Sequence, residues 1–387
     1  MYDEQFKEIL CFTNTYSGLI NCHVVDFITQ NLWETCLPDA LRFELERSKM
    51  DCVHWAEDDN HPVLTEFINL TKSLSLQSCS IEINSMDLKN TLPIIYNVNK
   101  CKYRSIKMEF MNIKKSHEVE CLGNIVGTAA SSTNSLVIDA GAGKAYLSMF
   151  LAENHKVPVL AIDSSQTCCK GAIGRQIKLR KRTKHSQNKN LILTGLHTCG
   201  SLTHSIIKTF LVTKDIHLLC IVPCCYHLTN ETFNKKINFS KNARMLAQQS
   251  IERSAENKSM SSSLFYRAVL QVILYSMGIY NARVGRGGPL HDFPSYARWA
   301  LLRIGVELEK IPSEEQLEST YQLHVHLSKR FYMFQMLRIH TGLVLEAAIM
   351  LDRIIFLQKS NLCSKLAILR LFDPVLSPRH YGIVVIK

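Results

Sequence analysis

The sequence lacks the features of a membrane or secreted protein. No window of about 18 or more uninterrupted apolar residues is present, so a transmembrane helix is not expected. The N-terminus, Met1–Gln5, has neither the basic start nor the apolar stretch of a signal peptide. These absences predict an intracellular protein, cytoplasmic or nuclear, with no membrane partner.

Paired CxxC motifs are also missing, although the chain contains 14 cysteines among its 387 residues. Without such pairs a zinc ribbon is not expected. Two pairs of cysteines are adjacent in sequence, Cys168–Cys169 and Cys224–Cys225, and adjacent cysteines rarely bridge each other. Because a reducing compartment keeps thiols reduced, we interpret most of the cysteines as small buried apolar residues.

Acidic residues are too few to balance the basic ones. The 45 Lys and Arg against 34 Asp and Glu give a formal net charge of +11, and part of the excess lies in the run Lys178–His185. A basic surface favours polyanions because phosphate neutralisation releases counterions, so RNA or a ribonucleoprotein component is a candidate partner. The run contains no aromatic residue for base stacking. The alternative is a solvated loop without a partner.

The apolar pattern divides the chain into three parts. Residues 1–106 look mostly helical and contain no chemical motif. Residues 107–240 alternate short apolar runs with helix-like segments, which predicts a Rossmann-like α/β domain whose mostly parallel sheet is covered on both faces. Residues 241–387 are predicted to be helical, with terminal strands at Ala367–Phe372 and Gly382–Ile386 that complete the fold.

Four apolar runs in the central part are predicted to be strands. They are Ser135–Ile138, Val157–Ile162, Leu191–Thr194 and Leu218–Val222. In an open parallel sheet, ligands bind beyond the carboxyl ends of the strands. We therefore expect the chemistry in the segments that follow these runs.

The first run leads into a glycine-rich turn, Asp139–Gly143, and an apolar helix follows. The glycines let the backbone approach a ligand and adopt positive φ angles. A phosphate-binding P-loop does not fit, because Ile138 and Ala145 occupy positions that require Gly and Ser or Thr. A dinucleotide fingerprint needs a small residue where Tyr146 stands, so an NAD oxidoreductase is disfavoured. The remaining pattern resembles the first motif of S-adenosylmethionine-dependent methyltransferases, Asp-x-Gly-x-Gly-x-Gly, with Ala145 in place of the last glycine.

A second acid supports this interpretation. Asp163 ends the second run, 20 residues beyond Gly143, where a carboxylate can accept both hydroxyls of an adenosine ribose. The alternative is that Asp163 only caps the next helix, since two serines follow it. The turn and the acid together predict binding of S-adenosylmethionine.

Two further strand ends carry unusual residues. Gly195-Leu196-His197-Thr198-Cys199-Gly200 follows the third run, and Pro223-Cys224-Cys225-Tyr226-His227 follows the fourth. His197 is a candidate general base because its ordinary pKa lies nearest neutrality. Tyr226 is a candidate for positioning a substrate through its ring or hydroxyl. Five soft or borderline metal ligands also lie here, but their spacing matches no metal motif, so no metal is predicted.

The glycine-rich turn and the two strand ends together resemble the methyltransferase-like protein 25 family, which includes a paralogue named for a ribosomal RNA adenine dimethylase domain. Met111–Val119 is similar to the family's Lys-Lys-x-His-Glu segment. Leu351–Arg353 and Leu371–Pro374 through Ser377–Arg379 are similar to its C-terminal signature. The resemblance covers residues from about 107 to the end of the chain. It implies a Rossmann-like methyltransferase.

The resemblance also implies site residues. It assigns the cofactor to the motif residues Asp139, Gly141, Gly143 and Asp163, and it adds Lys115, His117 and Glu118 near the amino-acid end of S-adenosylmethionine. It does not identify a substrate.

The chain departs from the family pattern in its central segment. Only 27 residues separate Asp163 from Leu191, whereas a helix, a third strand and another helix with loops need about 40–60, at about 11 residues per helix and 5 per strand. The sequence therefore predicts an abbreviated sheet. Two hypotheses follow, a methyltransferase that holds a nucleophile in line with the methyl group, or a binding protein that kept the fold and lost the chemistry.

Overall fold

The structure is a computed structural model, and it describes residues 2–47, 61–79, 82–83, 111–166, 190–249, 251, 262–280, 282, 284 and 287–387. The basic run at 178–185, for which contact with RNA is predicted, lies outside the described residues. Within the described part, no helix is long and apolar enough to cross a bilayer.

The centre of the structure is a seven-stranded sheet of order β1-β6-β7-β5-β4-β2-β3. The strands are β1 (Glu82–Ile83), β2 (Leu136–Ala140), β3 (Val159–Ile162), β4 (Leu191–Cys199), β5 (Ile216–Cys224), β6 (Lys365–Arg370) and β7 (Tyr381–Ile386). Only β7 runs antiparallel to its neighbours, β5 and β6. The predicted Rossmann-like α/β fold with a mostly parallel sheet is confirmed, and the last two strands of the chain lie inside it.

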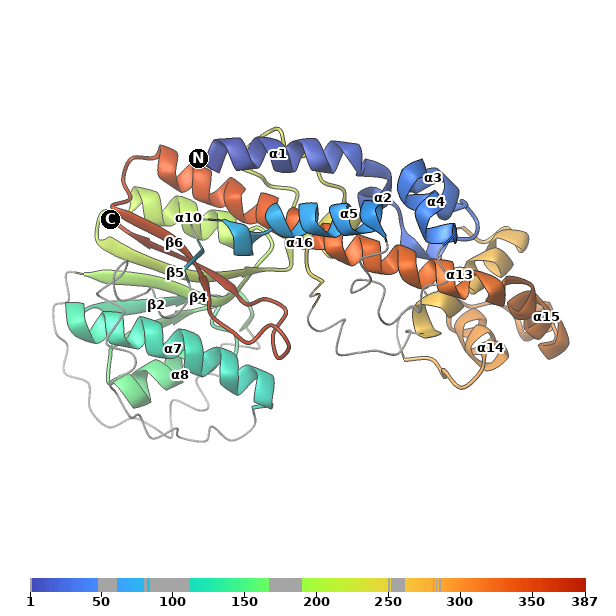
Figure 1. Ribbon diagram of the computed structural model, residues 1–387. Coiled ribbons are helices and arrows are strands. Elements are labelled where there is room, and N and C mark those ends of the chain that lie inside the picture. Colours follow the sequence, from blue (N-terminus) through green and yellow to red (C-terminus); the bar gives the residue numbers. More distant parts are fainter. Residues whose placement is uncertain are drawn as a thin grey trace.

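Helices cover both faces of the sheet (Figure 1). The helices of this part are α7 (Ile113–Thr133), α8 (Tyr146–Phe150), continued by the π-helical turn η4 (Leu151–His155), and α10 (Leu202–Val212). Alternate residues of β5 point to opposite layers. Leu218 and Cys220 pack in the cluster with α7 and α8, while Leu219 and Ile221 pack in the cluster with α10 and the long helix α16 (Ser328–Lys359). Burial on both faces explains the continuous apolar runs.

The sheet ends at β3 among the described residues. Leu160 and Ile162 of this strand are 51% and 49% exposed, as expected for an edge. Residues 167–189, between β3 and β4, lie outside the described part, so the abbreviated sheet expected from the short segment after Asp163 stays a prediction.

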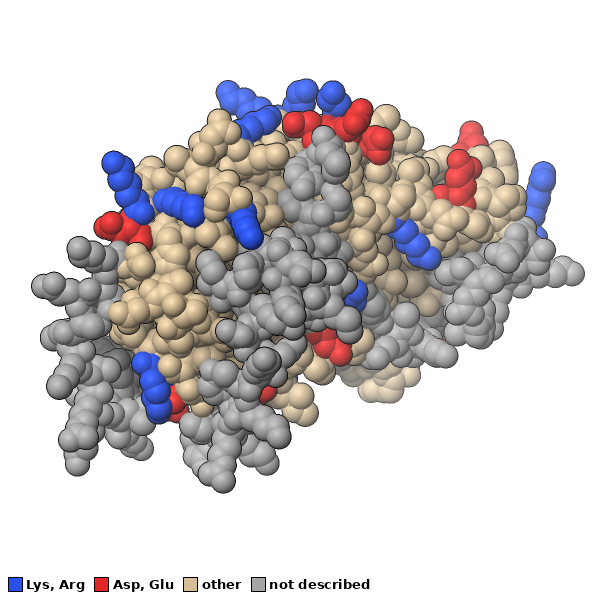
Figure 2. All heavy atoms as spheres, turned by 60° about the vertical axis from the view of Figure 1, so that its left-hand side comes forward, with Lys and Arg blue, Asp and Glu red and all other residues tan. Residues whose placement is uncertain are grey.

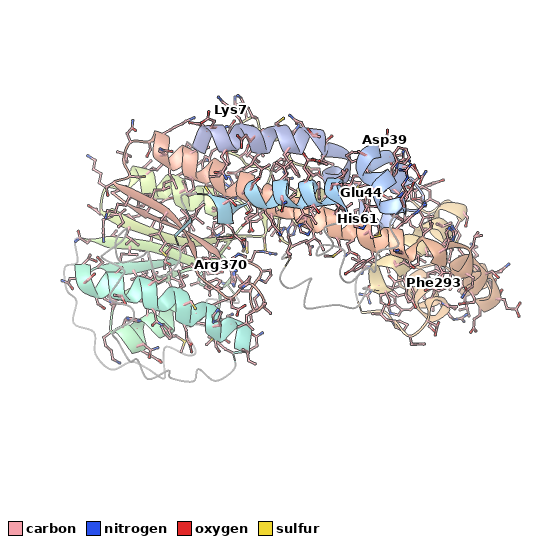
Figure 3. The ribbon with its side chains drawn as sticks, viewed as in Figure 1. Lys7, Asp39, Glu44, His61, Phe293 and Arg370 are labelled. Atoms are coloured by element: carbon pink, nitrogen blue, oxygen red, sulfur yellow. The ribbon has the colours of Figure 1, made fainter. Side chains whose placement is uncertain are left out.

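The N-terminal part is helical, as predicted, and most of its described helices are short. These are α1 (Tyr2–Thr15), α2 (Ser17–Asn21), the 3₁₀ turn η1 (Val24–Asp26), α3 (Leu32–Cys36), α4 (Asp39–Arg47), α5 (Pro62–Ser73) and the 3₁₀ turn η2 (Leu76–Ser78). Asn31, before α3, adopts a left-handed conformation that ends the preceding turn. Figure 3 shows Glu44 and His61 where α4 meets α5; the Glu44 carboxylate accepts the N–H groups of Val63 and Leu64 and thus caps α5.

The C-terminal part holds the remaining helices. Among the described residues they are α11 (Lys241–Leu246), α13 (Ser262–Ser276), α14 (Phe293–Arg303), α15 (Glu314–His324) and α16, with the 3₁₀ turns η6 (Leu308–Lys310) and η7 (Val325–Leu327). The 3₁₀ turn η5 (Tyr226–Leu228) precedes this part and follows β5. The helix α16 runs from this bundle to the sheet, with α1 and α5 alongside it (Figure 1). One apolar core therefore joins the N-terminal helices, the bundle and one face of the sheet.

Candidate active site

The strand order reverses at β2, which lies between β4 and β3. Ligands of open α/β sheets bind at such a switch point, outside the carboxyl ends of the strands. The segments after β2 and β4 meet at this place. A Cβ atom added to Gly141 would lie 2.9 Å from Leu202 Cδ2 and 3.9 Å from the carbonyl oxygen of His197. The glycine-rich turn and the His197 segment are therefore in contact.

The glycine-rich turn uses a left-handed backbone at three positions, with φ of 76° at Gly141, 55° at Gly143 and 59° at Ala145. Space above Gly143 is open, since an added Cβ would meet no atom within 4 Å. Ala145 stands where the family motif has its last glycine, and its φ explains why glycine suits that position.

The N–H groups of this turn point to protein acceptors. Those of Gly141 and Ala142 donate to the Ile162 carbonyl at 2.8 and 3.0 Å, and that of Ala145 donates to the Ala142 carbonyl. Gly143 N–H donates to the Asp163 carboxylate at 2.7 Å. A phosphate site needs free N–H groups, so this turn does not suit a phosphate ligand.

The two predicted acids of the site have different surroundings. Asp139 is buried, and its carboxylate accepts the Ser148 hydroxyl at 2.6 Å. Burial raises the pKa of Asp139 to about 6, against the opposing hydrogen bonds from Ser148 and with a smaller contribution from Asp163. Asp163 is only half-buried at the end of β3 and accepts the N–H groups of Gly143 and Ser165. Asp163 is thus partly open to solvent at the end of β3, whereas Asp139 is enclosed beside the turn.

The second turn of α7 brings Glu118 to His197. The helix begins after Asn112, whose side chain accepts the Lys115 N–H. Glu118 is buried, with one carboxylate oxygen 3.2 Å from His197 Nε2 and the other accepting the Ser377 hydroxyl at 2.6 Å. Burial acts to raise the pKa of Glu118, but the hydrogen bonds from His197 and Ser377 outweigh it and lower the pKa below the usual value.

The other two candidates on α7 contact protein groups beside the site. His117 Nε2 accepts the N–H of Asp373 at 3.0 Å, and its ring lies edge-on to Phe372. The Lys115 ammonium lies over the Tyr146 ring, 4.3 Å from its centroid. The Lys-Lys-x-His-Glu segment thus holds the C-terminal signature, more than 250 residues away in sequence, against the His197 segment.

A bulge in β4 positions His197. The pairing of β4 with β5 shifts register between Gly195 and Thr198, and such an extra residue re-aims side chains near functional sites. A Cβ on Gly195 would lie 2.7 Å from the Ala140 carbonyl oxygen, so only glycine permits this close approach of β4 to β2. Because a Glu118 carboxylate can only accept, His197 Nε2 carries the hydrogen of their bond and Nδ1 is left to accept a proton.

The structure does not place Tyr226 at the open edge. Cys225 adopts a left-handed conformation, φ 50°, which turns the next residue into the core. The Tyr226 ring is buried, its hydroxyl donates to Glu346 at 2.9 Å, and Arg353 lies over the ring. Positioning a substrate through an exposed ring or free hydroxyl, the role predicted for Tyr226, does not fit this geometry.

The sequence interpretation missed three residues of this site. Ser377 and Ser148 bind the buried carboxylates Glu118 and Asp139, and Arg379 donates to the backbone and side chain of Gln248 near the end of β5. Ser377 and Arg379 belong to the C-terminal signature, so the resemblance of that segment to the family could have pointed to them. Ser148 lies nine residues beyond Asp139 with no pattern to single it out.

The comparisons agree with this geometry. Residues 114–232 match a family model described as a methyltransferase domain. The chain is 23% identical to the human protein named "Probable methyltransferase-like protein 25" over an alignment that covers 99% of this chain and 96% of that protein. A mouse protein of the same name is 22% identical with the same coverage. The predicted resemblance to this family is confirmed.

The alignments also show a difference in length. They extend over 583 and 578 positions, far more than the 387 residues of this chain, so both relatives contain segments without a counterpart here. A shortened segment between β3 and β4 is consistent with that difference.

Proposed function

We propose that this chain is an S-adenosylmethionine-dependent methyltransferase, because residues 114–232 match a methyltransferase domain. The cofactor would bind at the carboxyl ends of β2, β3 and β4. Its acceptor would lie beside His197. The observation that carries the proposal is the meeting of the glycine-rich turn with Asp163 and with the segment of His197, which is paired with Glu118, at the switch point of the sheet.

The residues at the switch point fit an adenosine-containing ligand without phosphates. The N–H groups of the turn already donate to protein acceptors, which argues against a pyrophosphate ligand. No atom lies within 4 Å of a Cβ position on Gly143, so a ligand can approach the backbone there closely. Asp163 is half-exposed, and its carboxylate lies at the strand end where an acid accepts ribose hydroxyls in nucleotide-binding sheets. It would accept the ribose hydroxyls.

The chemistry divides between the cofactor and the chain. Bound S-adenosylmethionine supplies an activated methyl group. The chain orients the acceptor and takes its proton, for which His197 Nδ1 is available while Glu118 fixes the ring through Nε2. Ser377 and Lys114 hold Glu118 in turn, at 2.6 and 3.6 Å, so the carboxylate stays ionised and stabilises a protonated imidazole.

We propose RNA as the acceptor class. The net charge of +11 favours a polyanion. The face shown in Figure 2 does not single out where RNA would lie, because its Lys and Arg are dispersed among acidic and uncharged residues. The basic run 178–185 therefore carries the RNA hypothesis, and a protein acceptor is the alternative outcome of the test.

A second candidate function is a binding protein that has lost catalysis. Its support is the short segment between Asp163 and Leu191, whose 27 residues are fewer than a further strand with its helices normally needs. The intact turn and Asp163 argue against it, because a scaffold has no need of a ribose-binding acid.

Calorimetric titration of the full chain with S-adenosylmethionine and S-adenosylhomocysteine tests the proposal. We expect micromolar binding, weakened by Asp163→Ala about 10- to 100-fold because charged hydrogen bonds are lost. Asp215→Ala is the matched control, since Asp215 is exposed at the opposite end of the same sheet. Absence of binding by folded protein would overturn the enzyme hypothesis and favour the scaffold.

A separate measurement tests the role of His197. His197→Ala should keep cofactor affinity and lose methyl transfer, measured with labelled cofactor on total RNA and on RNA-free protein extract. Transfer to the protein extract alone would reject RNA as acceptor. Unchanged turnover in His197→Ala would reject His197 as the base.

A further inference from the structure

Three cysteines gather at the carboxyl edge of the sheet. Cys199 is the last residue of β4 and Cys224 the last of β5, and they are direct partners in the parallel register. In-register residues of adjacent parallel strands point to the same face, so the thiols meet, with Sγ atoms 2.9 Å apart. Cys225 follows, and all three Sγ atoms lie within 4.8 Å of one another.

The backbone at Cys225 indicates that its thiol has a role. Both strands are followed by a left-handed residue, Gly200 with φ 57° and Cys225 with φ 50°. The first position has the glycine that this conformation favours, whereas the second has a side chain that strains it. The Cys225 side chain is only partly buried, so packing alone does not explain why a side chain is present at this position. A ligand role for sulfur accounts for the cysteine.

The dimensions suit a tetrahedral ion. With Zn–S bonds of about 2.3 Å, tetrahedral geometry places sulfur atoms about 3.8 Å apart. The Sγ separations here run from 2.9 Å to no more than 4.8 Å, so small side-chain rotations reach that spacing. Arg379 lies close enough to interact with the charges of Cys199 and Cys225, and it offsets the negative charge of a three-thiolate zinc complex.

We propose that Cys199, Cys224 and Cys225 bind one zinc ion, with water at the fourth position. The two histidines of these segments do not belong to the thiol group, and His227 Nδ1 instead lies 2.6 Å from Gln248 Nε2. Three protein ligands with an open fourth position are typical of reactive rather than purely structural zinc sites. Binding displaces the three thiol protons to solvent, which leaves three thiolates on the metal.

The experiment measures zinc in the full chain, purified under reducing conditions without chelator, by elemental mass spectrometry. We expect about one zinc per chain, and a thiolate-to-metal absorption band in the near ultraviolet when cobalt(II) replaces it. Cys199→Ser, Cys224→Ser and Cys225→Gly should each lower metal affinity about tenfold or more. Cys363→Ser is the matched control, since Cys363 is a partly buried thiol beyond α16 and outside the group.

The Cys225→Gly variant separates metal binding from folding. Glycine relieves the left-handed strain, so in the presence of a chelator this variant should unfold at the same temperature as the wild type or higher. Without chelator it should retain less metal than the wild type. Two results would overturn the proposal. One is a reduced wild-type chain that takes up no zinc or cobalt; the other is a Cys199–Cys224 disulfide found by peptide mapping in protein isolated with thiols blocked at lysis.

Discussion

At the scale of single residues, the glycine-rich turn combines a strained backbone with a buried charge. Ala145 is held left-handed without the glycine that would relieve it, and Asp139 is buried beneath the turn with Ser148 as its hydroxyl partner. Both features cost folding free energy, and both lie under the proposed cofactor. Local strain of this kind is typical of functional sites.

Ala145→Gly should stabilise the chain. Relief of the left-handed conformation yields about 1–2 kcal/mol, which the greater backbone freedom of glycine in the unfolded chain reduces to about 0.5–1 kcal/mol. Ala142→Gly in the same turn is the control, because Ala142 does not have a positive φ and its replacement should destabilise. Urea unfolding measures both. A shift of the two variants in the same direction would contradict the argument from backbone conformation.

Asp139→Asn should change the dependence of stability on pH. The pKa of folded Asp139 is raised to about 6, so the folded state binds more protons than the unfolded state at mildly acidic pH. Its contribution to stability is present below about pH 4 and is lost as pH rises through 6. Between pH 4 and 7 the variant should therefore gain up to about 3 kcal/mol relative to wild type. Parallel curves from urea unfolding across this range would disprove it.

At the scale of elements, α7 is positioned by its glycines. A Cβ on Gly123 would clash with the Phe150 ring, and one on Gly127 would clash with the buried ring of His155. These close approaches let α7 lie against α8 and η4. The second turn of α7 then brings Glu118 to His197.

Gly127→Ala should destabilise the chain although alanine is the better helix former. The gain in helix propensity is about 1 kcal/mol, whereas overpacking costs about 1–3 kcal/mol because His155 is buried and tied to Asn124. His155→Ala removes the clashing ring, so Gly127→Ala made in that background should be neutral or stabilising. Denaturant unfolding of the two single variants and the double variant gives the coupling. Additive effects would show that the ring is not the obstacle.

The sequence predicts those elements whose position depends only on which residues are buried. The strands follow the apolar runs because both faces are covered, and the turn follows from its glycines. The continuation of β4 through His197 was not predictable, since its bulge depends on close approach to Ala140. Nor was the contact of Glu118 with Ser377, which joins segments 259 residues apart through the tertiary fold. Tyr226 was misplaced because the left-handed turn at Cys225 was not foreseen.

At the scale of the whole molecule, α16 joins the parts of the chain through buried polar side chains. Arg338 donates to the carbonyl groups of Leu19 and Cys22 in the N-terminal part. Glu346 accepts the Tyr226 hydroxyl. Because β7 lies between β5 and β6, the C-terminal strands belong to the same sheet as the methyltransferase domain. The N-terminal helices are joined to this unit through α16.

The chain should therefore unfold in a single transition, and a substitution on α16 should lower the stability of the whole. Asp352 is buried, and its carboxylate accepts the N–H groups of Phe233 and Asn234 at 2.9 and 2.6 Å. Asp352→Ala leaves both donors without an acceptor and should cost about 2–4 kcal/mol, whereas Asp352→Asn keeps one acceptor and should cost less. Calorimetry, with circular dichroism of the helices and tyrosine absorbance as separate probes, should show one transition that moves to lower temperature. Two transitions, of which Asp352→Ala shifts only one, would mean that the helical parts and the sheet are independent folding units joined by α16 without energetic coupling.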